Sequence, residues 1–348
     1  MKNLYVVNTN YHIYLTILKA NYDFTTTGVK ADLILTDHLV NPLPKDMIKA
    51  FNSLNIFDKV LIMPDASISQ KTGRNLEKLF TYKTKIIDYV SKAFNDVNLN
   101  PLEAKYEKVF IFLDYSAISH YLMIKKIPLQ LIEDGIDIYY SYNENWRNYI
   151  DYIFGIPRKF GLSKYIENVW VLYPEKLPQV LKKKAKLYNI DIYKKECRED
   201  LTHKMTRLFI PHDEKKMHDA ILKVRDKKVF LLLTQSYSEF GHMSEEKKID
   251  IYKKTIEKYA NKDHFIIIKS HPKETTDYQK VFGQYMLLPG AIPIELISDL
   301  FVSIDTCVSI NSTAQLNIRA KHNIMIEGEF NEKGWKKYMN HLKVKENI

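Results

Sequence analysis

The hydrophobic residues of this chain follow two alternating patterns. Short runs rich in β-branched and aromatic residues alternate with longer stretches that place apolar side chains on one helical face. Apolar strands separated by amphipathic helices are typical of parallel sheets with both faces covered. The sequence therefore predicts an α/β fold with two successive Rossmann-like halves. The short runs predict strands at residues 4–7, 33–36, 60–63, 108–113, 129–132, 169–172, 229–234, 265–268 and 307–310.

The length of the chain indicates two domains rather than one. At 348 residues it exceeds the size at which a single hydrophobic core usually stops growing. We expect a first domain over residues 1–175, a second over 176–330 and a helical tail over 331–348. The lysine-rich segment 181–193 fits a solvated helix or connector better than a nucleic-acid site. Ligands of open α/β sheets bind beyond the carboxyl ends of the strands, so two such halves predict a central cleft.

Composition and charge narrow the class of protein. The two cysteines are too few for a disulfide framework, and no cysteine and histidine cluster has zinc-ligand spacing. We therefore expect a reducing, cytoplasmic compartment and no metal. No stretch approaches the roughly 20 apolar residues that span a bilayer. The formal net charge of +10 indicates an anionic partner and leaves open whether the protein docks at the inner face of a membrane.

Glu133 and Asp134 are the first candidate catalytic residues. They follow the predicted strand 129–132 and precede Gly135, which permits a tight turn. A carboxylate at such a strand end is partly desolvated, which raises its pKa toward the range that suits a general base. The alternative is an ordinary turn in which both acids face water or cap a helix.

His271 and Pro272 form the second candidate site. They follow the predicted strand 265–268 and lie between Lys269 and Lys273. Proline ends the strand and fixes the backbone that presents the imidazole and ammonium groups. An imidazole beside lysines can donate hydrogen bonds to a phosphate or protonate it as it leaves. The alternative is a purely structural corner at the end of the strand.

Further polar residues occupy helix starts and strand ends. Ser312 and Thr313 precede a predicted helix, where hydroxyl and backbone N–H groups either bind phosphate or simply cap the helix. Glu295 follows Pro293 at another helix start and suits either a ribose hydroxyl or the helix dipole. Other residues at strand ends, which we expect to line the same cleft, are Thr9, Asn10, Tyr11, His12, Gln235 and Glu239.

The order of these short motifs resembles that of bacterial sialyltransferases. Glu133-Asp134-Gly135, His271-Pro272 and Ser312-Thr313 are similar to the acid-acid-glycine, His-Pro and Ser/Thr-pair motifs of those enzymes. Together with the first strand and the segments 269–273 and 293–296, they most resemble glycosyltransferase family 52, which includes lipooligosaccharide and capsule sialyltransferases. The resemblance spans most of the chain and depends on the ensemble of motifs.

The resemblance implies a GT-B fold, in which two Rossmann-like domains face a central cleft. It implies that the first domain presents the acceptor sugar and that the second binds the donor, CMP-sialic acid. His271 would then contact the CMP phosphate as the general acid, and Glu295 would hold the ribose. The general base would be Glu133, Asp134 or Glu239. Further donor contacts are implied for Lys269, Ser270, Pro272, Lys273, Gly290, Ala291, Ser312 and Thr313.

The physical chemistry agrees with an inverting mechanism that needs no metal or cofactor. The phosphate of CMP is a weak base and leaves readily, so His271, Lys269 and a helix N-terminus can stabilise its developing charge. A single carboxylate that removes the acceptor proton for in-line attack predicts inversion at the anomeric carbon. The sequence thus predicts transfer of sialic acid to a galactose-ended capsule or lipooligosaccharide glycan.

Two other hypotheses stay open at this point. Another GT-B transferase of surface polymers, such as a polysialyltransferase or a CDP-glycerol-dependent polymerase, also places His-Pro after a strand. A non-catalytic basic module would explain the charge, but the chain has no nucleic-acid-binding signature, and we expect no nucleic-acid partner. A homodimer is a further expectation from the family resemblance, while the linkage and the natural acceptor are undetermined.

Overall fold

The chain divides into two compact units, Met1–Leu208 and Phe209–Ile348, and each contains one parallel sheet. The predicted helical tail 331–348 and residues 141–158 lie outside the described residues. The computed structural model describes residues 1–38, 47–72, 76–135, 137–140, 159–197, 199–209, 219–221, 223–224, 226–301, 303–310, 312, 315 and 318–326.

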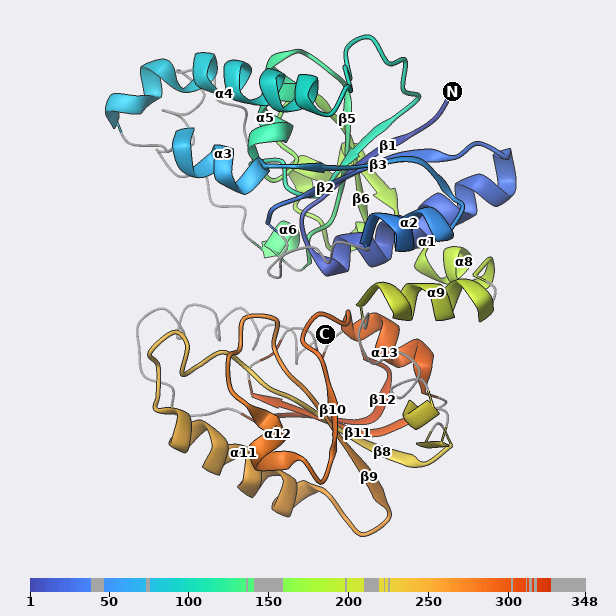
Figure 1. The fold of residues 1–348 in the computed structure, drawn as a ribbon, viewed down its shortest axis with the longest axis vertical. Coiled ribbons are helices and arrows are strands. Elements are labelled where there is room, and N and C mark those ends of the chain that lie inside the picture. The colour runs from blue at the N-terminus through green and yellow to red at the C-terminus, as the bar shows by residue number, and fades with distance from the viewer. Residues whose placement is uncertain are drawn as a thin grey trace. The chain divides into compact units, whose positions relative to one another are not determined.

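The sheet of the first unit has the strand order β3-β2-β1-β4-β5-β6-β7, with parallel neighbours throughout (Figure 1). β1 and β2 are buried along their whole length, as expected for apolar strands in the middle of a covered sheet. The order reverses between β1 and β4, which is where open α/β sheets bind ligands. The strands are β1 (Leu4–Val7), β2 (Ala31–Thr36), β3 (Phe57–Met63), β4 (Val109–Ile111), β5 (Leu129–Ile132), β6 (Ile166–Val171) and β7 (Ala185–Leu187).

Helices cover both faces of this sheet. One layer contains α3 (Asp65–Thr72), α4 (Leu76–Asp96) and α5 (Ala117–Ile124), which pack on one another and on the sheet (Figure 1). On the other face, α1 (Asn10–Thr27) packs against α8 (Ile190–Lys195). The remaining helical segments of the described part of this unit are α2 (Met47–Ser53), α6 (Asp137–Tyr140), α9 (Glu199–Phe209) and the 3-10 turns Pro174–Lys176 and Gln179–Lys184.

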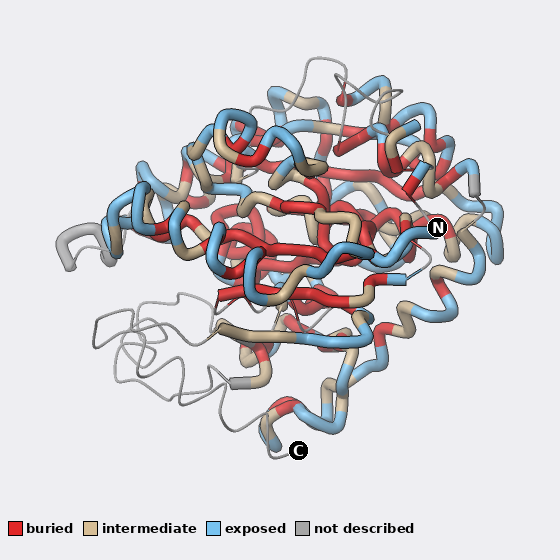
Figure 2. The backbone as a smooth tube through the Cα atoms, turned by 90° about the horizontal axis from the view of Figure 1, so that it is seen from below, coloured by how far each residue is buried: buried red, intermediate tan, exposed pale blue. Residues whose placement is uncertain are grey.

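The sheet of the second unit has the order β10-β9-β8-β11-β12, again parallel throughout. Its core joins Phe230 and Val308 of the central strands to Tyr252, Ile256 and Phe282 of the covering helices. In Figure 2 the central strands are coloured mostly as buried and the outer faces of the helices as exposed. The elements are β8 (Lys228–Leu233), α11 (Glu245–Tyr259), β9 (His264–Lys269), α12 (Tyr278–Phe282), β10 (Met286–Leu288), α13 (Ile294–Leu300), β11 (Ile304–Ile310) and β12 (Ala320–Ile326).

Each strand that the sequence predicted is present, whereas three edge or short strands escaped prediction. β7, β10 and β12 lie at sheet edges, where a strand buries less of its surface and needs no continuous apolar run. The segment 181–193 is therefore more than a connector, because it contains β7 and most of α8. Pairing of β7 with β6 also places residues beyond 175 in the first unit.

None of the helices in the described part of the chain combines the length and apolar character that crossing a bilayer requires.

Candidate functional site

One candidate site lies at the carboxyl edge of the first sheet. β5 ends at Ile132 and runs directly into Glu133 and Asp134. Gly135 follows with φ of 95°, a left-handed conformation that favours glycine, so the predicted tight turn is present. The two adjacent carboxylates have different surroundings.

Glu133 is buried and its carboxylate connects two strand ends. The backbone N–H of Leu172, just beyond β6, donates to Glu133 Oε2 at 2.8 Å. The hydroxyl of Tyr139 donates to the same oxygen. These bonds stabilise the carboxylate where it is and join the ends of β5 and β6, which suits a structural role.

Asp134 is the exposed member of the pair and is oriented by a buried histidine. Its side chain is 36% exposed, whereas that of His12 is fully buried and donates from Nε2 to Asp134 Oδ1. The His12 ring stacks on Phe112 with centroids 4.2 Å apart. Its Nδ1 accepts the N–H of Asn8 at 3.2 Å, so the neutral ring carries its proton on Nε2, which faces Asp134.

The start of α1 places His12 for this contact. The hydroxyl of Thr9 caps the helix by accepting the N–H of His12 at 3.3 Å. Asn10 and Tyr11, predicted to line the site, occupy the same first turn and are half-buried. The structure thus joins the first predicted strand end to the Glu133 and Asp134 motif.

A second candidate site lies at the carboxyl edge of the second sheet, where β9 runs into Ser270, His271 and Pro272. The N–H of Lys273 donates to His271 Nδ1 at 3.1 Å, so the neutral ring carries its proton on Nε2. Burial, assisted by the positive charges of Lys269 and Lys273, lowers the pKa of His271 to about 4. At neutral pH the imidazole is therefore uncharged and presents an N–H donor.

Lys269 and Gly290 support this loop from within the protein. The buried Lys269 ammonium donates to the carbonyls of Ser270 at 3.1 Å and Gly290 at 3.3 Å. Burial lowers the pKa of Lys269 to about 8, against the opposing charges of Glu295 and Glu274. A Cβ on Gly290 would lie 2.8 Å from the His271 carbonyl oxygen, so this position requires glycine.

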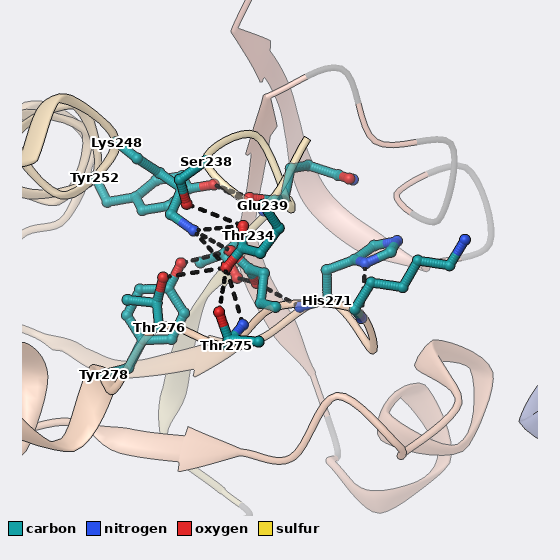
Figure 3. Close-up of polar contacts among 12 residues, drawn as sticks. Thr234, Ser238, Glu239, Lys248, Tyr252, His271, Thr275, Thr276 and Tyr278 are labelled. Carbon is teal, nitrogen blue, oxygen red and sulfur yellow. Dashed lines mark hydrogen bonds and ion pairs between the residues drawn. The ribbon is translucent and has the colours of Figure 1, made fainter. Parts of the chain in front are cut away.

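Glu239, the alternative base, belongs to a buried network beneath the loop (Figure 3). It accepts the Lys248 ammonium at 3.0 Å and the N–H of Thr275 at 2.9 Å. Burial opposes ionisation, but hydrogen bonds from Thr275, Lys248 and Ser238 outweigh it and lower the pKa of Glu239 to about 2. So weak a base accepts a hydroxyl proton poorly.

The remaining predicted donor residues lie at ends of the same sheet. The N–H of Gln235 donates to the Tyr252 hydroxyl at 2.7 Å, and Glu295 is buried in the first turn of α13. Ser312 is buried beyond β11, and its carbonyl accepts the N–H of Gln315 at 3.3 Å. Thr313 lies outside the described residues. Ala291 is half-buried, and the exposed side chains here are those of Pro272 and Lys273.

Among the residues that the structure describes, no group of three or more histidine, cysteine, aspartate or glutamate side chains is arranged to hold a metal ion.

The comparison with protein-family models matches residues 52–328 to glycosyltransferase family 52. The chain belongs to glycosyltransferase family 52. A relative from Haemophilus influenzae, described as an uncharacterized protein, is 34% identical over 202 residues. That match covers 57% of this family 52 chain and 61% of the relative, so it spans less than two thirds of the relative's length. The predicted family is confirmed.

Solved structures confirm the predicted GT-B fold of this family 52 member. The GT-B domain of a sialyltransferase from Photobacterium damselae superposes with a TM-score of 0.55 at 11% identity, covering 97% of this chain and 94% of that one. An α/β-galactoside α-2,3-sialyltransferase from Photobacterium phosphoreum gives 0.54 at 14% identity, with coverages of 93% and 91%. UDP-GlcNAc 2-epimerase from Methanocaldococcus jannaschii gives 0.50 at 14% identity, with coverages of 94% and 89%.

Two residues of the second candidate site, Lys248 and Glu274, have no signal in the sequence. Lys248 lies on α11 and Glu274 lies three residues beyond His271, and neither follows a strand directly. Lys248 occupies a lysine-rich amphipathic helix, in which a buried lysine has no local signature. Only the fold identifies it as the partner of two carboxylates.

Proposed function

We propose that this family 52 chain is a metal-independent, inverting sialyltransferase. Its donor would be CMP-sialic acid and its acceptor a galactose-ended glycan of the capsule or lipooligosaccharide type. The observation that carries the proposal is Asp134, an exposed carboxylate at a strand end whose orientation is fixed by the buried His12. Two Photobacterium proteins with the same fold are sialyltransferases, which supports the choice of sialic acid.

Asp134 supplies the base in this proposal. The carboxylate accepts the proton of the acceptor hydroxyl while the hydroxyl oxygen forms a bond to the anomeric carbon. The bond from that carbon to the CMP phosphate oxygen breaks, and its electron pair stays on the phosphate. Attack opposite to the leaving group inverts the anomeric configuration.

His271 and the neighbouring lysines stabilise the leaving phosphate in this proposal. The neutral imidazole presents Nε2–H as a hydrogen-bond donor, and Lys273 adds an exposed positive charge. Burial, assisted by repulsion from Lys269 and Lys273, lowers the pKa of His271 to about 4, and a phosphate bound beside the ring offsets that repulsion. The ring then takes up a proton from solvent more easily, and that proton balances the one His271 gives to the departing phosphate as the general acid.

Transfer from CMP-sialic acid to lactose in the presence of EDTA tests the proposal. Removal of a general acid or base typically costs about 10²–10⁴-fold in rate, so we expect such losses for Asp134→Asn and His271→Asn. Both variants should unfold at nearly the temperature of the wild-type protein. A requirement for a divalent metal, or a wild-type rate in either variant, would refute the proposal.

The donor nucleotide separates the proposal from the other surface-polymer transferases. CMP should raise the Tm of the purified chain at concentrations at which CDP does not, because ligand that binds only the folded state stabilises it. A preference for CDP would favour a CDP-glycerol-dependent enzyme.

The proposal also includes a cytoplasmic location, peripheral docking at the inner membrane face and a homodimer. Cell fractionation tests the location and the docking, and light scattering tests the homodimer.

A further inference from the structure

A buried cluster of three charged side chains lies beneath the loop that carries His271. Lys248 comes from α11, Glu239 from the segment after β8, and Glu274 from the His271 loop itself. The side chains of Lys248 and Glu274 are each 1% exposed. Charged groups so deeply buried are rare unless they are paired, because removing a charge from water is costly. The hydrogen bonds of the cluster therefore indicate what it contributes to the protein.

Glu274 connects the cluster directly to the backbone of His271. Its Oε2 accepts the N–H of His271 at 2.6 Å and also the hydroxyl of Thr234 at the end of β8. Its Oε1 accepts the hydroxyl of Tyr278 at 2.6 Å and the Lys248 ammonium at 3.3 Å. Four donors therefore fix this carboxylate, and through it the point at which the imidazole joins the chain.

Glu239 fixes the far end of the same loop. Its Oε1 accepts the N–H of Thr275 at 2.9 Å and the hydroxyl of Thr276 at 3.4 Å. Its Oε2 accepts the hydroxyl of Ser238 at 3.0 Å. The two carboxylates thus hold the loop at residues 271 and 275 and connect it to the end of β8.

Lys248 contacts both carboxylates and balances part of their charge. Its ammonium lies 3.0 Å from Glu239 and 3.3 Å from Glu274. Two carboxylates that share one site repel each other, and without a cation between them they would be driven apart. Removal of one partner of a buried ion pair is strongly destabilising because it leaves an uncompensated charge.

Figure 3 shows that the cluster faces the backbone of His271 while the imidazole points away from it. The hydrogen bonds of the cluster therefore act on the ring through the backbone. We propose that Lys248 and Glu274 are positioning residues that hold His271 Nε2 where the departing phosphate needs its proton. This inference rests on the role of His271 in the proposed function.

The test compares three variants in the transfer reaction from CMP-sialic acid to lactose. Glu274→Gln keeps the shape of the side chain but turns a carboxylate oxygen into an amide, and Lys248→Met removes the shared cation. Lys254→Met is the matched control, since Lys254 lies on the same helix in an exposed ion pair with Asp250. A misplacement of about 1 Å can cost about 10²-fold in rate, so we expect kcat losses of that order for the first two variants.

The kcat and KM values separate positioning from a merely structural role. At temperatures well below Tm, the KM for lactose should stay within about twofold of wild type while kcat falls, since a displaced His271 impairs the chemical step more than binding. A structural role would lower Tm and leave kcat of the folded protein unchanged. Lys254→Met should match the wild type in both respects.

The outcomes for the inference and for the proposed function differ. If His271→Asn retains wild-type activity, the proposed function fails. If His271→Asn is inactive while Glu274→Gln and Lys248→Met are folded with wild-type kcat, the positioning inference alone fails. Amide hydrogen exchange of the wild-type protein tests the positioning inference even if both variants misfold. The His271 amide should exchange at least about 10²-fold more slowly than in an unfolded chain. Exchange at the rate of an unfolded chain would overturn the inference.

Discussion

Gly290→Ala is the substitution that most directly tests whether the position of His271 controls turnover. Gly290 follows β10, and its carbonyl accepts the Lys269 ammonium. A Cβ added there would lie 2.8 Å from the His271 carbonyl oxygen and 2.9 Å from Pro272 Cα. Both neighbours are backbone atoms, so no side-chain rotation relieves the clash and the loop itself must shift.

The contact distances set the size of the shift. Ordinary van der Waals contact begins at 3.4 Å, so the His271 carbonyl must retreat by 3.4 − 2.8 = 0.6 Å. If a misplacement of about 1 Å costs about 10²-fold, a shift of this size costs roughly 10-fold in kcat. Overpacking of this kind also lowers the free energy of unfolding by about 1–3 kcal/mol.

The assay measures kcat for sialic acid transfer to lactose together with unfolding in urea. Gly28→Ala serves as the control, because Gly28 follows α1 with φ of 71° and has open space around its Cα. A left-handed alanine there costs about 1–2 kcal/mol, which matches the expected stability loss of Gly290→Ala. Only Gly290→Ala should lose kcat.

Equal kcat values for Gly290→Ala, Gly28→Ala and the wild type would refute this reasoning. Such a result would mean either that the loop absorbs the methyl group without moving the imidazole or that the imidazole has no part in turnover. A structure of Gly290→Ala would then distinguish the two explanations.

Three further predictions concern His12, the pH dependence of stability that arises from His271, and the metal requirement. His12→Phe should keep a ring stacked on Phe112 but remove the Nε2 donor, so kcat should fall at least about 10-fold with a small change in Tm. His12→Gln, whose amide can donate to Asp134, should recover part of this loss. Equal kcat values for His12→Phe and the wild type would argue against a role for the contact between His12 and Asp134. The pKa of His271 is lowered to about 4 from 6.5 in the unfolded chain, so between these pH values the unfolded chain binds more protons, and the free energy of unfolding should fall as the pH drops from 6.5 to 4. Urea unfolding at pH 7 and pH 5 should therefore show a smaller drop in the free energy of unfolding for His271→Asn than for the wild type. Identical drops would contradict the lowered pKa of His271. EDTA should leave kcat unchanged, and recovery of lost activity by added Mg²⁺ or Mn²⁺ would count against a metal-independent reaction.

The sequence by itself determined the central strands and the polar residues that follow them. β1, Leu4–Val7, is a continuous apolar run because a central strand of a covered parallel sheet is buried on both faces. The N-cap Ser244, which accepts the N–H of Lys247, likewise marks the start of α11 in the sequence. Such signals depend on neighbouring residues only, so they can be recognised in the sequence without knowledge of the rest of the fold.

Edge strands and paired charges depend on the tertiary structure. β7 and β12 have no continuous apolar run, since an edge strand buries less of its surface, and only their partners β6 and β11 define them. Glu133 and Asp134 are adjacent and chemically alike in the sequence. The fold distinguishes them by supplying Leu172 to one and His12, 122 residues away, to the other.

The same reason explains why Lys248 and Glu274 escaped prediction. A lysine on an amphipathic helix and a glutamate in a loop are ordinary surface residues by local pattern. Desolvation and the pairing of opposite charges arise only when α11 packs beside the His271 loop. The environment that gives a charged side chain its role is built from distant parts of the chain, and so only the tertiary structure decides it.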